Sequence, residues 1–240
     1  MAVRARSYLE PHAQKSLTYN MTSLRRASLA ATLFVSSVLL SAPLFSQTTL
    51  TPDQALNKLL EGNARFVAGT ASHPDQSPER RAELASGQSP FAIVLTCSDS
   101  RVAPEIYFDQ GLGDLFVLRN AGNVLDDHTI GSIEYAIEHL HAKLVIVVGH
   151  EKCGAVAATV AGGHAPGHIH TIVESIEPAF ESVKAKDGDK IENTVRANAR
   201  RVAELLGRVE PIVGEAVKAG HVKVVAGRYD LTSGKVEILQ

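Results

Sequence analysis

The 240-residue sequence is poor in cysteine, methionine and aromatic residues: it has two of each sulfur-containing residue, no tryptophan, and 5% aromatic residues. Two cysteines are too few to close a zinc site made of four cysteines. After residue 51 there is no internal repeat, low-complexity tract or bundle of transmembrane runs. The formal net charge is −2, and because residues 1–46 carry +4, the remainder carries −6. This mildly acidic body argues against nucleic acid as a partner.

Both cysteines lie just after apolar runs of strand length. Cys97 follows the run 91–96. Cys153 comes five residues after the run 144–148, and His150 lies between that run and Cys153. Two thiolates and an imidazole form a soft donor set for Zn²⁺, and three protein ligands leave a fourth position open, as in catalytic zinc sites. The His-x-x-Cys spacing lets one turn carry two ligands while Cys97 comes from another strand. The sequence therefore predicts one zinc ion on Cys97, His150 and Cys153.

Asp99 and Arg101 lie beside the first of these ligands. A bidentate guanidinium keeps an aspartate ionised and oriented, so that it can accept a hydrogen bond from metal-bound water. Zinc lowers the pKa of bound water from about 15.7 to about 7. Two thiolates donate charge to the metal, and we therefore expect this water to titrate somewhat above that value.

Two other interpretations of the cysteines stay open. Two cysteines in an exported protein often form a disulfide, which would make the chain a disulfide-stabilised binding protein. Alternatively, the zinc site could belong to a non-catalytic structural or storage module. The ligand spacing of His150 and the charged pair beside Cys97 favour a catalytic metal, because a disulfide requires neither.

Taken together, Cys-x-Asp-x-Arg at 97–101 and His-x-x-Cys at 150–153 resemble the β-class carbonic anhydrases of the plant-like branch. The resemblance covers nearly the whole chain after residue 51. It implies one zinc per subunit, a dyad of Asp99 and Arg101, and reversible hydration of CO₂ to bicarbonate and a proton. It also implies a homodimer or a dimer of dimers. Hydrolysis of CS₂ or COS on the same fold is an alternative activity.

The same resemblance assigns residues on the substrate side. Gln88 matches a glutamine that is placed to hydrogen-bond substrate, and Phe116 and Tyr135 match aromatic residues that line an apolar pocket suited to CO₂. The segment 119–123 matches a loop that borders the site. Gly154 begins a helix directly after the second cysteine, and the amides of its first turn are expected to face the metal and a bound anion.

Residues 1–46 are predicted to be a signal peptide. The pair Arg25-Arg26 precedes an apolar run at 27–40, and small residues follow. The mature protein would then be exported from a bacterial-type cytoplasm, periplasmic or secreted, with no stable membrane association. Met21 is an alternative start, the arginine pair also fits twin-arginine export, and a retained membrane anchor is the alternative to cleavage.

Residues 47–240 are predicted to form a single α/β catalytic domain. Apolar runs alternate with helical patterns, which is typical of a mostly parallel sheet covered by helices on both faces. Such runs lie at 91–96, 115–118, 144–148 and 222–225. Ser233-Gly234 precedes an alternating run at 235–239, which predicts a hairpin and an antiparallel carboxyl-terminal edge strand.

Helices are expected at 51–68, 78–85, 129–140, 154–160, 172–183, 191–206 and 211–218. The first two form an amino-terminal helical arm, 51–87, which has no obvious core of its own and is expected from the resemblance to pack across a partner subunit. By helical position alone, Tyr135 would be an ordinary core aromatic. Arg196, Arg200 and Arg201 are expected to form a solvated face.

Overall fold

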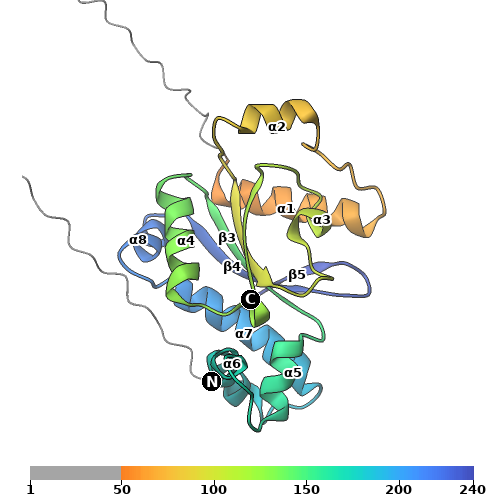
Figure 1. The fold of residues 1–240 in the computed structure, drawn as a ribbon, viewed down its shortest axis with the longest axis vertical. Coiled ribbons are helices and arrows are strands. Elements are labelled where there is room, and N and C mark those ends of the chain that lie inside the picture. The colour runs from red at the N-terminus through yellow and green to blue at the C-terminus, as the bar shows by residue number, and fades with distance from the viewer. Residues whose placement is uncertain (1–49) are drawn as a thin grey trace, which may run out of the picture. The chain divides into compact units, whose positions relative to one another are not determined.

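The computed structural model describes residues 50–240, so the predicted leader and Met21 lie outside the described residues. Within 50–240 the strands form a five-stranded sheet in the order β2-β1-β3-β4-β5 (Figure 1). Strands β1 to β4 run parallel, and β5 is antiparallel to β4. The predicted α/β architecture with an antiparallel edge strand is confirmed. The strands are β1 (Ala92–Cys97), β2 (Leu115–Asn120), β3 (Leu144–His150), β4 (Lys223–Tyr229) and β5 (Val236–Leu239).

Helices cover both faces of the sheet (Figure 1). The helices are α1 (Pro52–Val67), α2 (Pro78–Leu84), α3 (Pro104–Tyr107), α4 (Asp127–Glu138), α5 (Gly154–Ala161), α6 (Ile169–Val183), α7 (Lys190–Leu206) and α8 (Ile212–Lys218), with a 3₁₀ turn, η1 (Ala121–Asn123). Helices α1 and α3 pack on one face, and α4, α7 and α8 pack on the other. Among the described residues, no helix is both long enough and apolar enough to cross a membrane.

The central strands β1 and β3 are buried along their whole length. Val94 and Ile146 contact the core beneath α1 and α3, whereas their neighbours Ile93 and Val145 contact the core beneath α4 and α8. Because successive side chains of a strand point to opposite faces, a strand covered on both sides must be apolar at every position. This burial explains why the two strands appear in the sequence as unbroken apolar runs.

Helix α1 packs against its own chain. Leu59 is fully buried, and the amide of Asn63 donates to the carbonyls of Tyr107 and Gly234 and accepts from the N–H of Val236, each at 2.8 Å. For α1 the expectation of no core within its own chain is therefore wrong, because its apolar stripe is completed by α3 and the β4–β5 hairpin. Helix α2 has no buried residue, and packing of the arm across a partner subunit stays a prediction.

The arginines of α7 are not simply a solvated face. Arg196 pairs with Glu192 on its own helix, at 2.7 Å, and with Glu237 on β5, at 2.6 Å. Arg200 donates to the backbone carbonyl of Gln240 at 2.6 Å. The prediction is wrong for these two residues, because α7 lies next to the edge strand and the arginines fasten the carboxyl-terminal segment to it.

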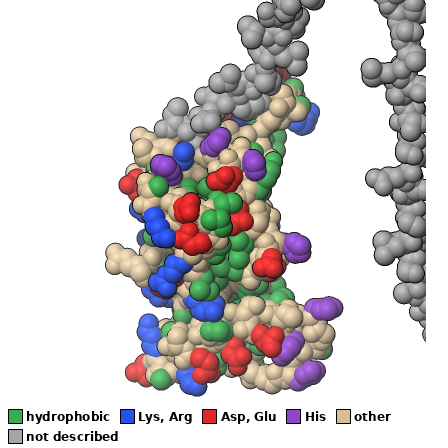
Figure 2. Space-filling view, turned by 90° about the vertical axis from the view of Figure 1, so that its left-hand side faces the viewer, with side chains coloured by type: hydrophobic (Ala, Val, Ile, Leu, Met, Phe, Trp, Pro, Cys, Tyr) green, Lys and Arg blue, Asp and Glu red, His purple; other side chains and the backbone are tan. Residues whose placement is uncertain are grey.

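The surface carries mixed charge. On the face drawn in Figure 2, Asp and Glu side chains lie interspersed with Lys and Arg, and hydrophobic side chains are visible between them. Interspersed charges of both signs produce no extended field of one sign.

The order of the strands creates one crevice at the carboxyl edge of the sheet. The chain leaves β1 toward β2 on one side, and leaves β3 toward β4 on the other side. Open α/β sheets bind ligands at such a switch point, where adjacent strands are followed by connections in opposite directions. Cys97 ends β1 and His150 ends β3, so two of the predicted metal ligands flank this crevice.

Candidate metal centre

The predicted ligands come together from three elements. Cys97 ends β1, His150 ends β3, and Cys153 is the residue that caps α5. Between the last two, Lys152 has a φ of 53°, so the chain reverses sharply into the helix. The ligand atoms of these three buried residues lie within 4.8 Å of one another. Residues 56 positions apart along the chain thus meet at one point.

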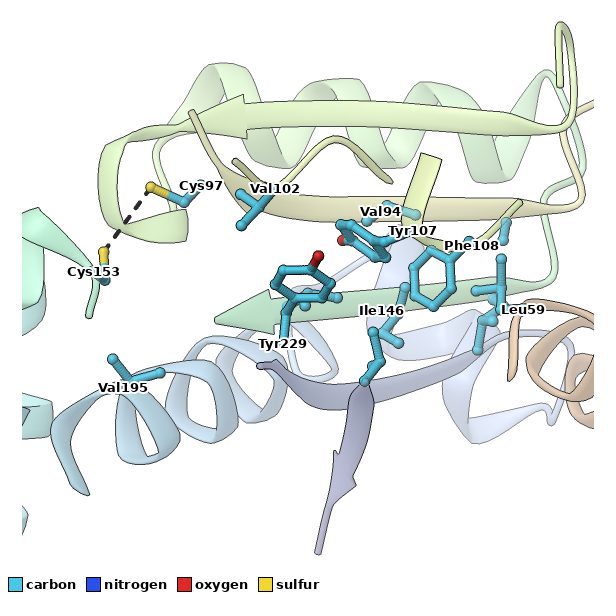
Figure 3. Close-up of a cluster of buried hydrophobic side chains, with 14 of the residues drawn as sticks. Leu59, Val94, Cys97, Val102, Tyr107, Phe108, Ile146, Cys153, Val195 and Tyr229 are labelled. Atoms are coloured by element: carbon cyan, nitrogen blue, oxygen red, sulfur yellow. Dashed lines mark hydrogen bonds between the residues drawn. The ribbon is translucent and has the colours of Figure 1, made fainter. Parts of the chain in front are cut away.

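The distances fit a shared metal ion and not a disulfide. The two sulfur atoms lie 4.0 Å apart and point toward one another (Figure 3). A disulfide would place them about 2.05 Å apart. Two Zn–S bonds of about 2.3 Å at a tetrahedral angle place the sulfurs about 3.8 Å apart. Both cysteines are free thiols in the structure, so the disulfide interpretation is not supported.

The imidazole of His150 is also oriented so that one of its nitrogens can bind a metal ion. Its Nδ1 lies 2.9 Å from the backbone carbonyl of Glu151, and the opposite nitrogen, Nε2, is buried without a hydrogen-bond partner. A carbonyl accepts only from N–H, so the proton of a neutral ring lies on Nδ1 and the lone pair of Nε2 points into the cluster. An unpaired buried nitrogen is costly unless something binds it. A metal ion would satisfy it.

The two thiols lie within hydrogen-bonding distance of each other, and each alters the pKa of the other. The hydrogen bond from Cys153 is the largest influence that lowers the pKa of Cys97, to about 4, and the N–H of Gly122 acts in the same direction. The partner Cys153 has a raised pKa, because its proton is held by the sulfur of Cys97 and because it is buried. Because the thiolate and not the thiol is the metal ligand, metal binding at this pair would release protons from the thiols.

Asp99 lies beside this cluster and is ion-paired with Arg101. Its Oδ1 accepts from the Nε and the backbone N–H of Arg101, both at 2.9 Å, and its Oδ2 accepts from Nη2 at 2.7 Å. The side-chain bonds from Arg101 hold the pKa of Asp99 well below its usual range. Oδ2 also lies 3.9 Å from Nε2 of His150. An ionised, oriented acceptor thus borders the three metal-binding atoms.

Known proteins share this arrangement of sequence and fold. A family model described as carbonic anhydrase matches residues 92–236. The carbonic anhydrase of Mycolicibacterium smegmatis is 41% identical over 191 residues, which cover 78% of this chain and 93% of that protein. A tetrameric β-carbonic anhydrase of Sordaria macrospora matches in structure with a TM-score of 0.63 and 25% identity, over 77% of this chain and 96% of that chain. The chain belongs to the β-carbonic anhydrase family.

Other β-carbonic anhydrase comparisons agree. Carbonic anhydrase 2 of Mycobacterium tuberculosis is 40% identical over 188 residues, 77% of this chain and 91% of that protein. The β-carbonic anhydrase of Coccomyxa, solved in complex with acetazolamide, matches with a TM-score of 0.61 and 26% identity, over 77% of this chain and 86% of that chain. The predicted family and fold are therefore confirmed.

Gln88 lies at the opposite end of the sheet from the cluster. It is exposed, follows α2, and lines a surface hollow of about 640 Å³ with Leu84 and Gly113. From it the chain enters β1 at Ala92, and five residue steps of about 3.3 Å separate that end of the strand from Cys97, roughly 16 Å. Figure 1 likewise shows α2 and α5 at opposite ends of the molecule. A single chain does not bring this glutamine to the metal ligands.

Of the two predicted pocket aromatics, Phe116 lies away from the cluster and Tyr135 is exposed. Phe116 on β2 pairs with Ile93, near the amino end of β1, and lines a shallow hollow of about 370 Å³ that extends to Arg119. Tyr135 on α4 is 49% exposed, with its ring 5.0 Å from that of His139. Tyr135 is therefore not the core aromatic that its helical position predicts. Its role and that of Phe116 at the site stay predictions.

Gly154 lies where the sequence places it, as the first residue of α5 next to Cys153. It is exposed, and a Cβ on it would have no atom within 4 Å. The amides of the following residues, Val156 and Ala155, favour the charged form of the Cys153 sulfur and so oppose the rise in its pKa. These amides are outweighed by burial and by the bond to Cys97, and the role of Gly154 toward a bound anion stays a prediction.

Sequence reasoning missed how the ligand-bearing segments are held. Arg119 donates from Nε to the carbonyl of Cys97 at 3.0 Å and from Nη2 to the carbonyl of Asp99 at 2.6 Å, so it fixes the chain as it leaves β1. Asn198 on α7 is buried and donates to the carbonyl of Gly122 at 2.9 Å. The only sequence signal for Asn198 is a polar residue on the apolar face of an amphipathic helix.

Proposed function

We propose that this β-carbonic anhydrase is a zinc enzyme that reversibly hydrates CO₂ to bicarbonate and a proton, with one Zn²⁺ per subunit on Cys97, His150 and Cys153. Two sulfurs and the unpaired Nε2 are the donor types and the number found in catalytic zinc sites, with a fourth position left for solvent or substrate. Bound there, Zn²⁺ would supply a Lewis acid that lowers the pKa of water toward about 7.

The observation that carries the proposal is the position of Asp99. Its carboxylate is bound at both oxygens by Arg101, and its Oδ2 lies 3.9 Å from the Nε2 of His150. From there it can accept a hydrogen bond at the open side of the ligand set and orient the attacking oxygen toward the carbon of CO₂. A structural or storage site needs no such acceptor.

The low pKa of Asp99 also limits its role. A carboxyl group held ionised by a guanidinium does not retain a proton near neutral pH, so Asp99 orients and does not store the proton that hydration releases. That proton must leave with solvent or buffer. We therefore expect the rate at saturating CO₂ to rise with buffer concentration until another step becomes limiting.

We also propose that the protein acts as a homo-oligomer, a dimer or a dimer of dimers. Gln88 and Tyr135 are both exposed, and Gln88 lies at the opposite end of the sheet from the proposed metal ligands of its own chain. If they contact substrate, they do so across an interface between copies. Analytical ultracentrifugation of the wild type and of Tyr135→Glu tests this, since a buried charge at an interface should dissociate the oligomer. A monomeric wild type would contradict it.

Export is a further part of the proposal. The basic pair, apolar run and small residues of 1–46 support a cleaved leader, either Sec or twin-arginine. Expression of the full chain in a bacterium, followed by fractionation and intact-mass measurement, should yield a periplasmic or secreted protein shortened by about this segment. An uncut cytoplasmic or membrane-held product would contradict it.

The decisive experiment is stopped-flow CO₂ hydration against pH on protein with verified zinc content. We expect an apparent pKa between about 7 and 9, and a large loss of rate with retained zinc in Asp99→Asn. Asp53→Asn, which removes an exposed carboxylate, is the control and should be active. Retained activity in Asp99→Asn would refute the role assigned to Asp99. If CS₂ or COS, measured in parallel, is turned over faster than CO₂, the substrate is CS₂ or COS and not CO₂.

A further inference from the structure

A backbone amide outside the ligand set points at one of the metal-binding sulfurs. The N–H of Gly122 donates to Sγ of Cys97 at 3.4 Å, within the range of hydrogen bonds to sulfur. Gly122 lies in the 3₁₀ turn after β2 and has a φ of 76°, a left-handed conformation that glycine adopts without penalty. Because glycine also adopts many other conformations, the direction of this N–H depends on what surrounds the turn.

Two contacts fix the turn. Asn198 donates from Nδ2 to the carbonyl of Gly122 at 2.9 Å, which restricts rotation about the Cα–C bond of the glycine. A Cβ on Gly122 would lie 2.6 Å from Cδ1 of Ile176 and 3.1 Å from Cβ of Ala155, so α5 and α6 close tightly around it. Of these contacts, the hydrogen bond from Asn198 is the directional one.

The same stretch of α7 also supports the second ligand-bearing strand. A Cβ on Gly149, the residue before His150, would lie 3.1 Å from Cγ1 of Val195 and 3.5 Å from Cβ of Ala199. Figure 3 shows Val195 in the group of buried side chains that includes Cys97 and Cys153. Asn198 lies between these two contacts and is 1% exposed, so its side chain cannot turn out to solvent.

We propose that Asn198 is a positioning residue for the metal ligand Cys97. By holding the carbonyl of Gly122, it keeps the N–H of the same residue directed at the sulfur, and so tunes how much charge that sulfur donates to the metal. Hydrogen bonds to ligand atoms orient them and alter their donor strength. The inference rests on the proposed zinc site.

Cobalt(II) in place of zinc gives a direct readout, because its sulfur-to-metal charge-transfer band reports the donor energy of the thiolates. Asn198→Leu keeps the number and branching of the side-chain heavy atoms and removes the donor. We expect its band to move to longer wavelength, since a sulfur without the N–H bond holds its electrons less tightly. In competition with a chelator, the zinc affinity should fall about 10-fold, in the range observed for residues that support metal ligands.

Asn63→Leu is the matched control. Asn63 is also a buried asparagine on a helix and also bonds backbone groups, but those groups belong to α3 and to the β4–β5 hairpin. This substitution should lower thermal stability without moving the cobalt band. An unchanged band in Asn198→Leu, with a loss of stability like that of the control, would show a merely structural role and overturn the proposal.

A second measurement needs no variant. In wild-type protein loaded with ¹¹³Cd, a hydrogen bond from Gly122 to a metal-bound sulfur transmits a scalar coupling between the metal and the amide proton. Detection of this coupling supports the proposal even if Asn198→Leu fails to fold, and its absence overturns the proposal. Failure of the wild type to bind Co²⁺ or Cd²⁺ at all would instead refute the zinc site.

Discussion

Oδ2 of Asp99 lies 3.9 Å from Nε2 of His150, while both oxygens of the carboxylate are bound by Arg101. The acid thus lies beside a proposed metal ligand, and both of its oxygens are already bound by the arginine. An ionised carboxylate is itself a zinc ligand when nothing else occupies its oxygens. The guanidinium therefore determines which of these two roles Asp99 takes.

Removal of the Arg101 guanidinium should slow CO₂ hydration without releasing the metal ion. In Arg101→Gln the pKa of Asp99 should rise toward its ordinary value, because the side-chain bonds from Arg101 are the largest cause of its depression. We expect zinc to be retained and kcat/KM for CO₂ hydration to fall roughly 10- to 100-fold. Lys184→Gln, which removes a surface cation paired with Glu181, is the control. Wild-type kcat/KM in Arg101→Gln would show that the arginine has no part in the reaction.

Metal removal should leave two titratable thiols and a less stable protein. After chelation, denatured protein should react with two equivalents of a thiol reagent, since Cys97 and Cys153 are both free. Zinc restored to about 1,000 times its dissociation constant should stabilise the fold by about 4 kcal/mol, measured as a higher unfolding temperature. Cys153→Ser should lose most of this gain. Absence of reactive thiols in the unfolded wild type would indicate a disulfide and contradict the metal centre.

Asp109, in the turn after α3, binds the end of α1 and the segment that follows it. Its buried carboxylate accepts from Nε of Arg65 at 2.6 Å, from the N–H and hydroxyl of Ser72 at 3.0 Å, and from the N–H of His73 at 2.9 Å. Asp109→Asn leaves several of these donors without an acceptor. We expect a loss of about 3 kcal/mol at pH 7, measured by urea denaturation.

The pH dependence of this loss is distinctive. Burial alone would raise the pKa of Asp109, but the bonds from Ser72, Arg65 and His73 outweigh burial and hold the pKa well below its usual range. A depressed native pKa stabilises the fold above the unfolded value, near 3.9, and that contribution fades as the pH falls below it. The difference between wild type and Asp109→Asn should therefore be constant from pH 7 to 5 and shrink below about pH 4. A constant difference at lower pH would contradict this origin.

Gly122→Ala should damage the turn beside Cys97 in two separable ways. The new methyl meets Cδ1 of Ile176 at 2.6 Å, and the φ of 76° costs a non-glycine residue about 1 kcal/mol. Trimming the neighbour in Gly122→Ala/Ile176→Val should relieve the collision and leave the backbone cost. A double-mutant cycle on unfolding temperature measures the coupling. Strictly additive effects of the two substitutions would show that the new methyl of residue 122 does not collide with Ile176.

The clustering of Cys97, His150 and Cys153 and the arrangement of the sheet were predictable for a common reason. Strands buried on both faces must be apolar throughout, so β1 and β3 stand out as unbroken runs, and parallel neighbours bring their carboxyl ends to one edge. A cysteine and a histidine directly after two such runs therefore had to lie close together. The antiparallel β5 followed from Ser233-Gly234, which allows a tight turn.

The missed features depend on partners that no local pattern specifies. Asn63, Asp109 and Asn198 are buried polar residues whose partners lie at least 36 positions away, and a helical or loop pattern gives no sign of which backbone groups they bind. The arginines of α7 were assigned to solvent because the pattern of one helix does not reveal an adjacent strand edge. The positions of Gln88 and Tyr135 relative to the cluster follow from tertiary arrangement alone.

The bond between Asn63 and Val236 has a consequence for biosynthesis. Asn63 leaves the ribosome more than 170 residues before Val236, whose N–H donates to the Asn63 side chain. The packing of α1 is therefore expected to be completed only after β5 has left the ribosome. Deletion of β5 would remove this bond and leave α1 held by its remaining contacts, such as that of Asn63 with Tyr107.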